Sequence, residues 1–128
     1  MIFFAKKLCS KQKHKNKYME YFGFFYKRNV DYKRRILFPS QWKSDQKVFF
    51  WVGRHHEDED DILGRIYPES EWNTIKNQFE DKKEREEFFS RSCKLKLDSY
   101  NRLLLPKTCI SNMVDMDGCV DYIIIRSC

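Results

Sequence analysis

Apolar and polar residues alternate along several segments of the chain. Residues 92–97 read Ser-Cys-Lys-Leu-Lys-Leu, which is the period-two pattern of a strand with one buried face. The pattern predicts a half-buried strand that ends at Asp98, with Cys93 on its inner face. An aromatic and then basic run over residues 24–30 predicts a similar strand that ends at Asp31.

Uninterrupted apolar runs and a helical spacing predict the other elements. Trp72, Ile75 and Phe79 are spaced as on one face of a helix, and Pro68 with the acidic residues after it favours a helix start. Trp51 lies in an apolar run and is expected to pack in the core. The remaining pattern predicts strands over 48–52, 62–67 and 120–125, the second interrupted by Gly64, and helices over 40–47, 68–79 and 81–89.

One sequence motif occurs twice in the chain and ends each time with three apolar residues and a proline. Asp31–Pro39 reads DYKRRILFP, and Asp98–Pro106 reads DSYNRLLLP, 67 residues further on. An internal repeat of this kind sets the architecture. The chain is therefore predicted to consist of two similar halves. Each has a strand, a four-residue turn, a second strand, and a proline that ends that strand or opens a short helix.

Each repeated segment is expected to fold as a turn held by its own side chains. An aspartate at the start of a turn accepts hydrogen bonds from the backbone N–H groups just ahead of it. The arginine four residues later lies within reach of the same carboxylate. The simplest interpretation is a structural pair in each half, Asp31 with Arg35 and Asp98 with Arg102. On this interpretation each arginine pairs only with the aspartate of its own turn and has no further role.

The length of the chain fits one domain with a shared core. Its 128 residues are of single-domain length, and halves of roughly 60 residues bury too little surface to be stable alone. The halves are therefore expected to be interleaved or packed face to face. The predicted plan is a basic, disordered extension over 1–18, a first half over 19–80, and a connecting helix with a shortened second half over 81–128. Residues 1–18 are alternatively an upstream extension, with Met19 as the older start.

Positive charge is concentrated in the front of the chain. Residues 1–54 hold 14 Lys and Arg against 3 Asp and Glu, whereas residues 55–128 hold 11 against 16. A basic region favours an acidic partner, most often nucleic acid. A genome rich in A/T codons would also enrich lysine. Such a bias explains less well why Arg28, Arg34 and Arg35 occur in one short stretch.

The sequence offers little for catalysis or for a cofactor. Its five cysteines have no Cys-x-x-Cys spacing, which indicates neither a zinc site nor a disulfide framework. The acidic run His55–Asp61 contains metal-ligating side chains, but adjacent ligands lack the separated spacing of a closed site, and a solvated loop is the simpler interpretation. No apolar run approaches the length of a membrane span. We therefore expect no enzyme activity, no metal, no cofactor, no small-molecule substrate and no membrane contact, and a cytoplasmic protein.

The repeat and the segment between its two copies resemble the MraZ family. The shared features are two D-x-x-x-R turns followed by an apolar strand and a proline, a Y-P-x-x-x-W segment at Tyr67–Trp72, and an F-F-S segment at Phe88–Ser90. The resemblance covers about residues 19–126. It implies an α+β, mostly β fold, namely a pseudo-duplicated AbrB-like, double-split β-hairpin barrel with helices between and after the repeats.

The resemblance also implies a function. MraZ proteins are transcriptional regulators that form rings of identical subunits and bind short direct repeats in the promoter of a division and cell-wall operon. A homo-oligomer that binds double-stranded DNA in the nucleoid is therefore expected, with the basic residues of the turns facing the DNA. With the cations around the first turn added, the candidate DNA-binding residues are Lys27, Arg28, Lys33, Arg34, Arg35 and Arg102. The candidate turn-forming residues are Asp31, Asp98 and Asn101.

This chain departs from the family pattern in two respects. The family usually has glycine just before the arginine of each turn, where this chain has Arg34 and Asn101. If that position needs a positive φ, asparagine tolerates it and arginine adopts it at a cost of about 1 kcal/mol. The chain also stops before the aromatic segment and C-terminal helix of the family, so the second half is expected to lack its closing strand. The alternative function is a degenerate oligomeric interaction protein of the same fold without DNA binding.

Overall fold

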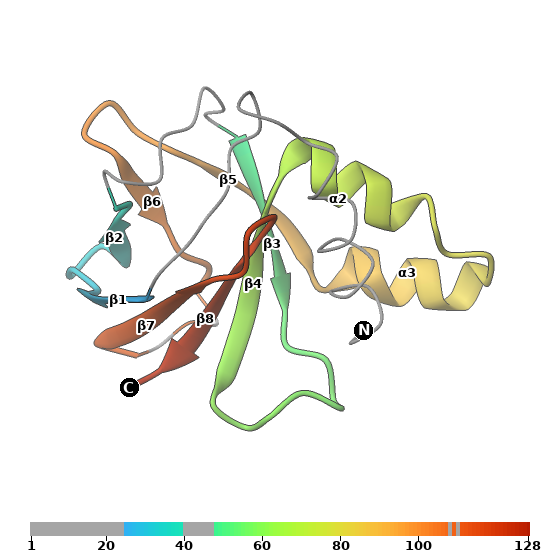
Figure 1. Ribbon diagram of the computed structural model, residues 1–128, viewed down its shortest axis with the longest axis horizontal. Helices are drawn as coiled ribbons and strands as arrows, with labels where there is room; N and C mark the ends of the chain where they lie inside the picture. The colour runs from blue at the N-terminus through green and yellow to red at the C-terminus, as the bar shows by residue number, and fades with distance from the viewer. Residues whose placement is uncertain (1–24, 40–47, 108, 110) are drawn as a thin grey trace.

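The computed structural model describes residues 25–39, 48–107, 109 and 111–128, and within them it is mostly β. The predicted helix over 40–47 and the extension over 1–18 lie outside the described residues. In chain order the elements are β1 Phe25–Asn29, β2 Arg35–Leu37, β3 Val48–Gly53, β4 Ile62–Pro68, α2 Glu69–Lys76, α3 Lys82–Ser90, β5 Ser92–Lys96, β6 Arg102–Leu104, β7 Met113–Gly118 and β8 Ile123–Ser127. Figure 1 shows the two helices on one side of the molecule and β2 with β6 on the other.

The strands are arranged about an approximate twofold relation. Six of them form an antiparallel sheet in the order β1-β7-β8-β4-β3-β5, and β2 pairs with β6 in a separate two-stranded ribbon. The repeat makes β1 to β4 of the first half the counterparts of β5 to β8 in the second. Replacing every strand by its counterpart reverses the order of the sheet and leaves the pairings unchanged. The approximate twofold axis therefore passes between β4 and β8 and between β2 and β6.

The two halves exchange strands. β1 of the first half pairs with β7 of the second, and β5 of the second half pairs with β3 of the first. The halves meet in the middle of the sheet, where β4 pairs with β8. Neither half closes a sheet from its own strands, so the core is shared. β8 takes the place in the second half that β4 takes in the first, and the expectation that the second half lacks its closing strand is wrong.

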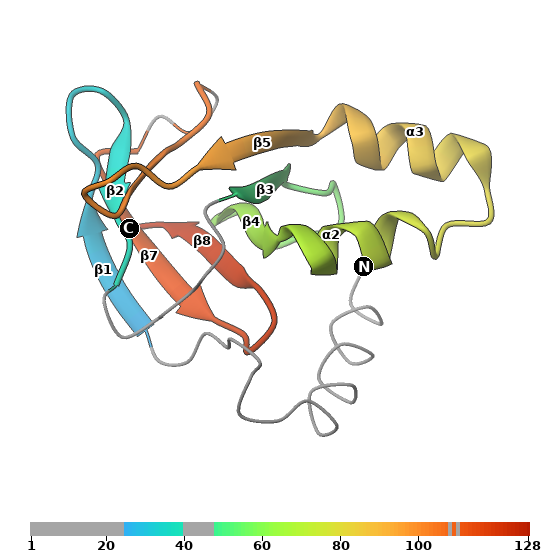
Figure 2. The same cartoon turned by 90° about the horizontal axis from the view of Figure 1, so that it is seen from above.

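Alternation along the strands divides the core between two faces. In β3, Phe49 and Trp51 face a cluster that also contains Ile36 and Leu103 of the β2–β6 ribbon. Val52 faces the other way, into a cluster formed with the two helices. Figure 2 shows α2 and α3 reaching away from the ribbon. The ribbon is thus anchored through its inner face, and its outer face is left for other contacts.

Both predicted helices form, although α2 ends at Lys76, so that Phe79 lies beyond it and not on its face as predicted. α2 follows Pro68, carries acidic side chains in its first turn, and buries Trp72 and Ile75. Trp72 stacks on Phe50 of β3, with ring centroids 4.1 Å apart. α3 begins after Asp81, whose carboxylate accepts the backbone N–H of Lys83. Neither of these described helices has the length and apolarity that a membrane crossing requires.

Several local predictions are wrong. β7 was not predicted, although its buried Val114 and Met116 alternate with polar residues, because the two aspartates at the polar positions have low strand propensity. The last strand begins at Ile123 rather than at residue 120. After the second repeat the described residues form a turn instead of a helix, in which the Cys109 N–H donates to the Pro106 carbonyl. Cys93 is exposed, because it lies at the start of an edge strand whose inner face is covered only further along.

Gly64 lies in β4 where the backbone closely approaches an indole ring. β4 continues through this residue with a register shift between Ile62 and Gly64, so the predicted interruption is a bulge. A Cβ built on Gly64 would lie 2.7 Å from Cε2 and 2.8 Å from Cη2 of Trp51. The same construction on Gly53 finds its nearest neighbour, the Arg91 carbonyl oxygen, at 3.5 Å.

We therefore expect Gly64→Ala to lower the free energy of unfolding by about 1–3 kcal/mol, because the added methyl group must displace the buried Trp51 ring. Urea denaturation followed by tryptophan fluorescence measures this change. Gly53→Ala is the matched control, since its methyl group makes an ordinary contact. Equal stabilities for the two variants would contradict the packing described here.

Candidate nucleic-acid interface

The aspartate of each repeat is the centre of its turn. Asp31 Oδ1 accepts hydrogen bonds from the backbone N–H groups of Lys33 at 2.9 Å and Arg35 at 2.8 Å, and Oδ2 accepts from Arg35 Nε at 2.8 Å. In the second turn Asp98 accepts from the N–H groups of Tyr100 and Arg102 at 2.8 Å and from Arg102 Nε at 2.9 Å. The predicted Asp–Arg pairs therefore form in both halves, with the same atoms.

These hydrogen bonds stabilise the ionised form of both carboxylates. The backbone N–H of Arg35 is the main cause that holds the pKa of Asp31 below its ordinary value, and the Arg35 side chain adds to it. At Asp98 the local loss of water opposes ionisation, but the bonds from the N–H groups and side chain of Arg102 and from Tyr100 still lower the pKa. Both turns thus depend on a charged aspartate.

The residue before each arginine has a left-handed backbone. Arg34 has φ 63° and Asn101 has φ 62°, which confirms the positive φ suggested by the family's usual glycine. The Arg34 N–H donates to the Asp31 carbonyl, and the Asn101 N–H donates to the Asp98 carbonyl. Arginine in this conformation is strained, whereas asparagine adopts it more readily. Among the described residues, Nε of Arg34 is in addition buried without a hydrogen-bond partner.

The β2–β6 ribbon joins the two turns. Its register places Ile36 opposite Leu103, and both side chains are buried. Beyond the ribbon, the Phe38 N–H donates to the Asn101 carbonyl and the Leu105 N–H donates to the Arg34 carbonyl, both at 2.8 Å. Each turn is therefore hydrogen-bonded to the other half of the chain.

The outer face of the ribbon carries two arginines and two leucines. Arg35 lies opposite Leu104, and Leu37 lies opposite Arg102. The leucines are half exposed, and the arginine side chains retain 23% and 31% of their accessible surface. We call the surface formed by Arg35, Leu37, Arg102, Leu104 and the two turns the turn surface. Neither arginine is enclosed, so both guanidinium groups are available to a partner.

Two exposed aromatic residues extend the turn surface, and sequence analysis did not single them out. Tyr32 is 85% exposed and Tyr100 is 73% exposed. Nζ of Lys33 lies 5.6 Å from the Tyr32 ring centroid, and Cζ of Arg102 lies 5.0 Å from the Tyr100 centroid. Their position in the middle of each repeated turn could have indicated this exposure. The aspartate carboxylate binds the backbone of the turn, so the side chains in the middle of the turn point to solvent.

The six candidate cations do not form one cluster. Lys27 and Arg28 are neighbours on β1 and point to opposite faces. Lys27 pairs with Asp115 of β7 at 3.0 Å, and Nε of Arg28 donates to the Leu37 carbonyl at 3.1 Å. Arg28 is therefore next to the turn surface but engaged with backbone, while Lys27 belongs to the outside of the sheet.

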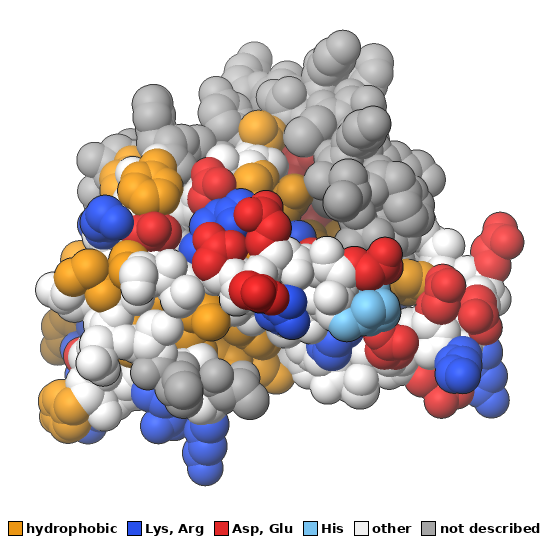
Figure 3. All heavy atoms as spheres, turned by 90° about the horizontal axis from the view of Figure 1, so that it is seen from below, with side chains coloured by type: hydrophobic (Ala, Val, Ile, Leu, Met, Phe, Trp, Pro, Cys, Tyr) orange, Lys and Arg blue, Asp and Glu red, His pale blue; other side chains and the backbone are white. Residues whose placement is uncertain are grey.

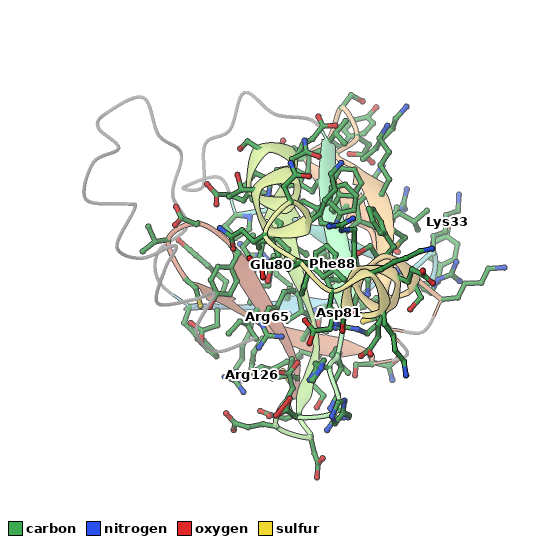
Figure 4. The ribbon with its side chains drawn as sticks, turned by 90° about the vertical axis from the view of Figure 1, so that its right-hand side faces the viewer. Lys33, Arg65, Glu80, Asp81, Phe88 and Arg126 are labelled. Carbon is green, nitrogen blue, oxygen red and sulfur yellow. The ribbon has the colours of Figure 1, made fainter. Side chains whose placement is uncertain are left out.

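Lys33 and Arg34 belong to the first turn, and Arg35 and Arg102 to the ribbon. Figure 4 shows Lys33 at the periphery of the molecule, away from the interior Phe88. The two turns lie at opposite ends of the ribbon, with Arg34 and Phe38 marking its length. These two residues flank the three-residue strand β2, and four residue steps of extended chain span about 13 Å. The structure thus brings together the repeats that the sequence separates by half its length.

The histidine loop forms a second surface cluster. Possible ligand atoms of His55, His56 and Glu57 lie within 4.8 Å of one another, and Figure 3 shows histidine at the surface among acidic and basic side chains. Nδ1 of His55 already accepts the Glu57 N–H at 3.2 Å, and burial lowers the pKa of the His55 imidazole. His56 and Glu57 are exposed. The arrangement fits a hydrogen-bonded loop more closely than a closed metal site.

The position of this loop is fixed by an ion pair below it. Asp58 accepts two hydrogen bonds from Arg65 of β4, at 2.8 and 3.0 Å, and both side chains are largely buried. Such a two-pronged arrangement holds the loop against the sheet.

No protein-family model matches this sequence, and no curated protein is similar enough to count as a match. The likeness to MraZ proteins is therefore carried by the repeated turns and the motifs between them.

The left-handed position of the first turn gives a stability prediction. Arg34→Gly should raise the free energy of unfolding by about 0.5–1 kcal/mol, because glycine adopts φ 63° without strain and this gain exceeds its extra unfolded-state entropy. Asn101→Gly should change stability less. Urea denaturation measures both values.

Lys33→Gly is the matched control for this prediction. Lys33 is outside the left-handed region, so glycine there only adds flexibility and should lower stability by about 0.5–1 kcal/mol. Equal destabilisation by Arg34→Gly and Lys33→Gly would mean that Arg34 is not strained in the folded protein.

Proposed function

We propose that the protein is a sequence-specific DNA-binding regulator of transcription, similar to MraZ, that binds repeated promoter boxes as an oligomer. The observation that carries this proposal is the turn surface, where both D-x-x-x-R turns are held on one side of the molecule at the two ends of a single ribbon. The exchange of β1 and β5 between the halves supports a pseudo-duplicated AbrB-like barrel of swapped hairpins.

The dimensions of the turn surface suit duplex DNA. The ends of the ribbon are about 13 Å apart, and the major groove of B-DNA is about 12 Å wide and admits a two-stranded ribbon. The first turn offers Lys33 and Arg34 to the phosphates, while Arg35 and Arg102 lie between the turns on the outer face. Nε of each arginine is held by its aspartate, and the two Nη atoms of each make no hydrogen bond within the described part of the chain. Two-pronged contacts to a phosphate or a base edge need those Nη atoms.

Oligomerisation is the second part of the proposal. A single turn surface with a few cations binds DNA weakly and loses affinity as salt rises. Repeating the subunit would link several such contacts, and repeated DNA boxes would then raise the overall affinity. The operator and the nucleoid location are part of the same proposal.

The first test removes two cations from the first turn. Lys33→Gln combined with Arg34→Gly should weaken binding to a duplex of the protein's own upstream region, and should flatten the slope of log Kobs against log salt by about 2 units if both side chains contact phosphates. Fluorescence anisotropy at several salt concentrations measures the slope. Arg34→Gly keeps the turn intact, so a loss of binding is not a loss of folding.

Lys82→Gln combined with Lys83→Gln is the control with the same change of net charge. These lysines are exposed on α3, which Figure 1 shows on the other side of the molecule from β2 and β6. This variant should bind as the unmodified protein does. The same loss in both double variants would mean that net charge, and not the turn surface, governs binding.

A second candidate function is an oligomeric interaction protein without DNA binding. The half-exposed Leu37 and Leu104 lie side by side with the paired arginines, and their apolar surface favours a protein contact more than a phosphate contact. On this alternative Arg35 and Arg102 only complete their turns.

Native mass spectrometry with and without the upstream duplex separates the two functions. The DNA-binding proposal predicts a mass several times that of one chain at micromolar concentration, and a further species with duplex bound. An oligomer that binds no duplex at low salt would leave the interaction protein as the function. If the protein is a monomer, it cannot link several weak DNA contacts, and the oligomeric part of the DNA-binding proposal is wrong.

A further inference from the structure

The two turns have the same backbone but different side chains. Each aspartate accepts the N–H of the residue two positions on, and each turn has its left-handed residue three positions on. At the first of these positions Lys33 of one turn corresponds to Tyr100 of the other. At the second, Arg34 corresponds to Asn101. The backbone therefore keeps the approximate twofold relation, but the side chains at equivalent positions of the two turns differ.

The difference changes the charge of the two turns. Residues 31–35 contain one aspartate and three cations, a net charge of +2, whereas residues 98–102 contain one aspartate and one arginine and are neutral. Phosphate contacts are driven by positive charge and are insensitive to sequence. The first turn is suited to that role, and the second is not.

Among the described residues, the arginine of the second turn has an aromatic contact that the arginine of the first turn lacks. Nε of Arg102 donates to Asp98 at 2.9 Å, and its guanidinium carbon lies 5.0 Å from the centroid of the Tyr100 ring. In the first turn the Tyr32 ring lies near Lys33 instead of Arg35. Arg102 is therefore oriented by a carboxylate and by an aromatic ring, while its Nη atoms make no hydrogen bond within the described residues.

An oriented guanidinium with unused Nη atoms suits base recognition. Arginine reads guanine through two parallel hydrogen bonds to O6 and N7, and this contact depends on the plane of the group. A ring beside the guanidinium restricts that plane through a cation–π contact. Tyr100 itself is exposed and makes few demands on the fold, so its side chain can be changed without removing a core contact.

We propose that the two turns divide the work of DNA recognition: the first turn binds phosphates without regard to sequence, and Arg102, positioned by Tyr100, reads a guanine edge. This inference rests on the proposed function and goes beyond it, because it assigns sequence discrimination to one of two nearly identical turns. Tyr100 is then a positioning residue for specificity.

The test compares affinities for two duplexes. One is the sequence that the unmodified protein enriches from a random duplex pool, and the other is the same composition shuffled. Tyr100→Leu should lower the ratio of the two affinities about two- to fivefold, the value of an exposed cation–π contact, without changing the salt slope. Tyr100→Phe keeps the ring and should restore the ratio. Arg102→Lys should lower the ratio about tenfold or more. The loss should arise from a guanine of the enriched sequence and not from its other bases.

Two variants of the first turn complete the test. Lys33→Gln should flatten the salt slope by about 1 unit and leave the ratio unchanged. Tyr32→Leu is the matched aromatic control and should leave the ratio unchanged as well. Equal effects of Tyr100→Leu and Tyr32→Leu on the ratio would overturn the division of work.

Failure of this inference is distinguishable from failure of the proposed function. If the protein binds duplexes but enriches no sequence, or if Lys33→Gln lowers the ratio while Tyr100→Leu changes the slope, the division of work is wrong and DNA binding stands. If the unmodified protein binds neither duplex at low salt, both are wrong.

Discussion

The bond network around one aspartate in each half is the constraint on which the molecule depends. Three donors converge on Asp31, and three converge on Asp98: two backbone N–H groups and the Nε of the following arginine. Each network bends the chain sharply enough to direct the next strand, β2 or β6, toward its counterpart. Because the backbone carbonyls of Arg34 and Asn101 then accept N–H groups from the opposite half, the turns also connect the halves.

The exchange of strands explains why the repeat does not produce two domains. β1 finds its partner in β7 and β5 finds its partner in β3, so the surface that each half would leave exposed is covered by the other. A half of roughly 60 residues buries too little surface alone, and interleaving removes that limit. The same arrangement fixes the distance between the two turns, since both are attached to one ribbon with a buried Ile36–Leu103 centre.

Duplication of the backbone leaves the side chains free to differ. Lys33 and Tyr100 occupy the same position of the turn, and so do the strained Arg34 and the easily accommodated Asn101. Retaining arginine at φ 63° costs stability and adds a cation beside Arg35. A cost of this kind in an otherwise regular turn is typical of a position where binding and stability favour different residues.

The sequence by itself determined the local structure of the turns. The carboxylate at the start and its pairing with the arginine four residues on follow from short-range chemistry, as does the strand before Asp98. The left-handed residue between them was suggested by the glycine that the MraZ family usually has there. Only the tertiary structure decided which strands pair, which face of β1 carries Lys27, and that Cys93 is exposed at the sheet edge. These depend on contacts between residues far apart in the chain, for which a local pattern has no signal. For the same reason the sequence did not show that its neighbouring cations lie in different places. Some lie in the first turn, Arg28 is hydrogen-bonded to backbone, and Lys27 lies on another surface of the sheet.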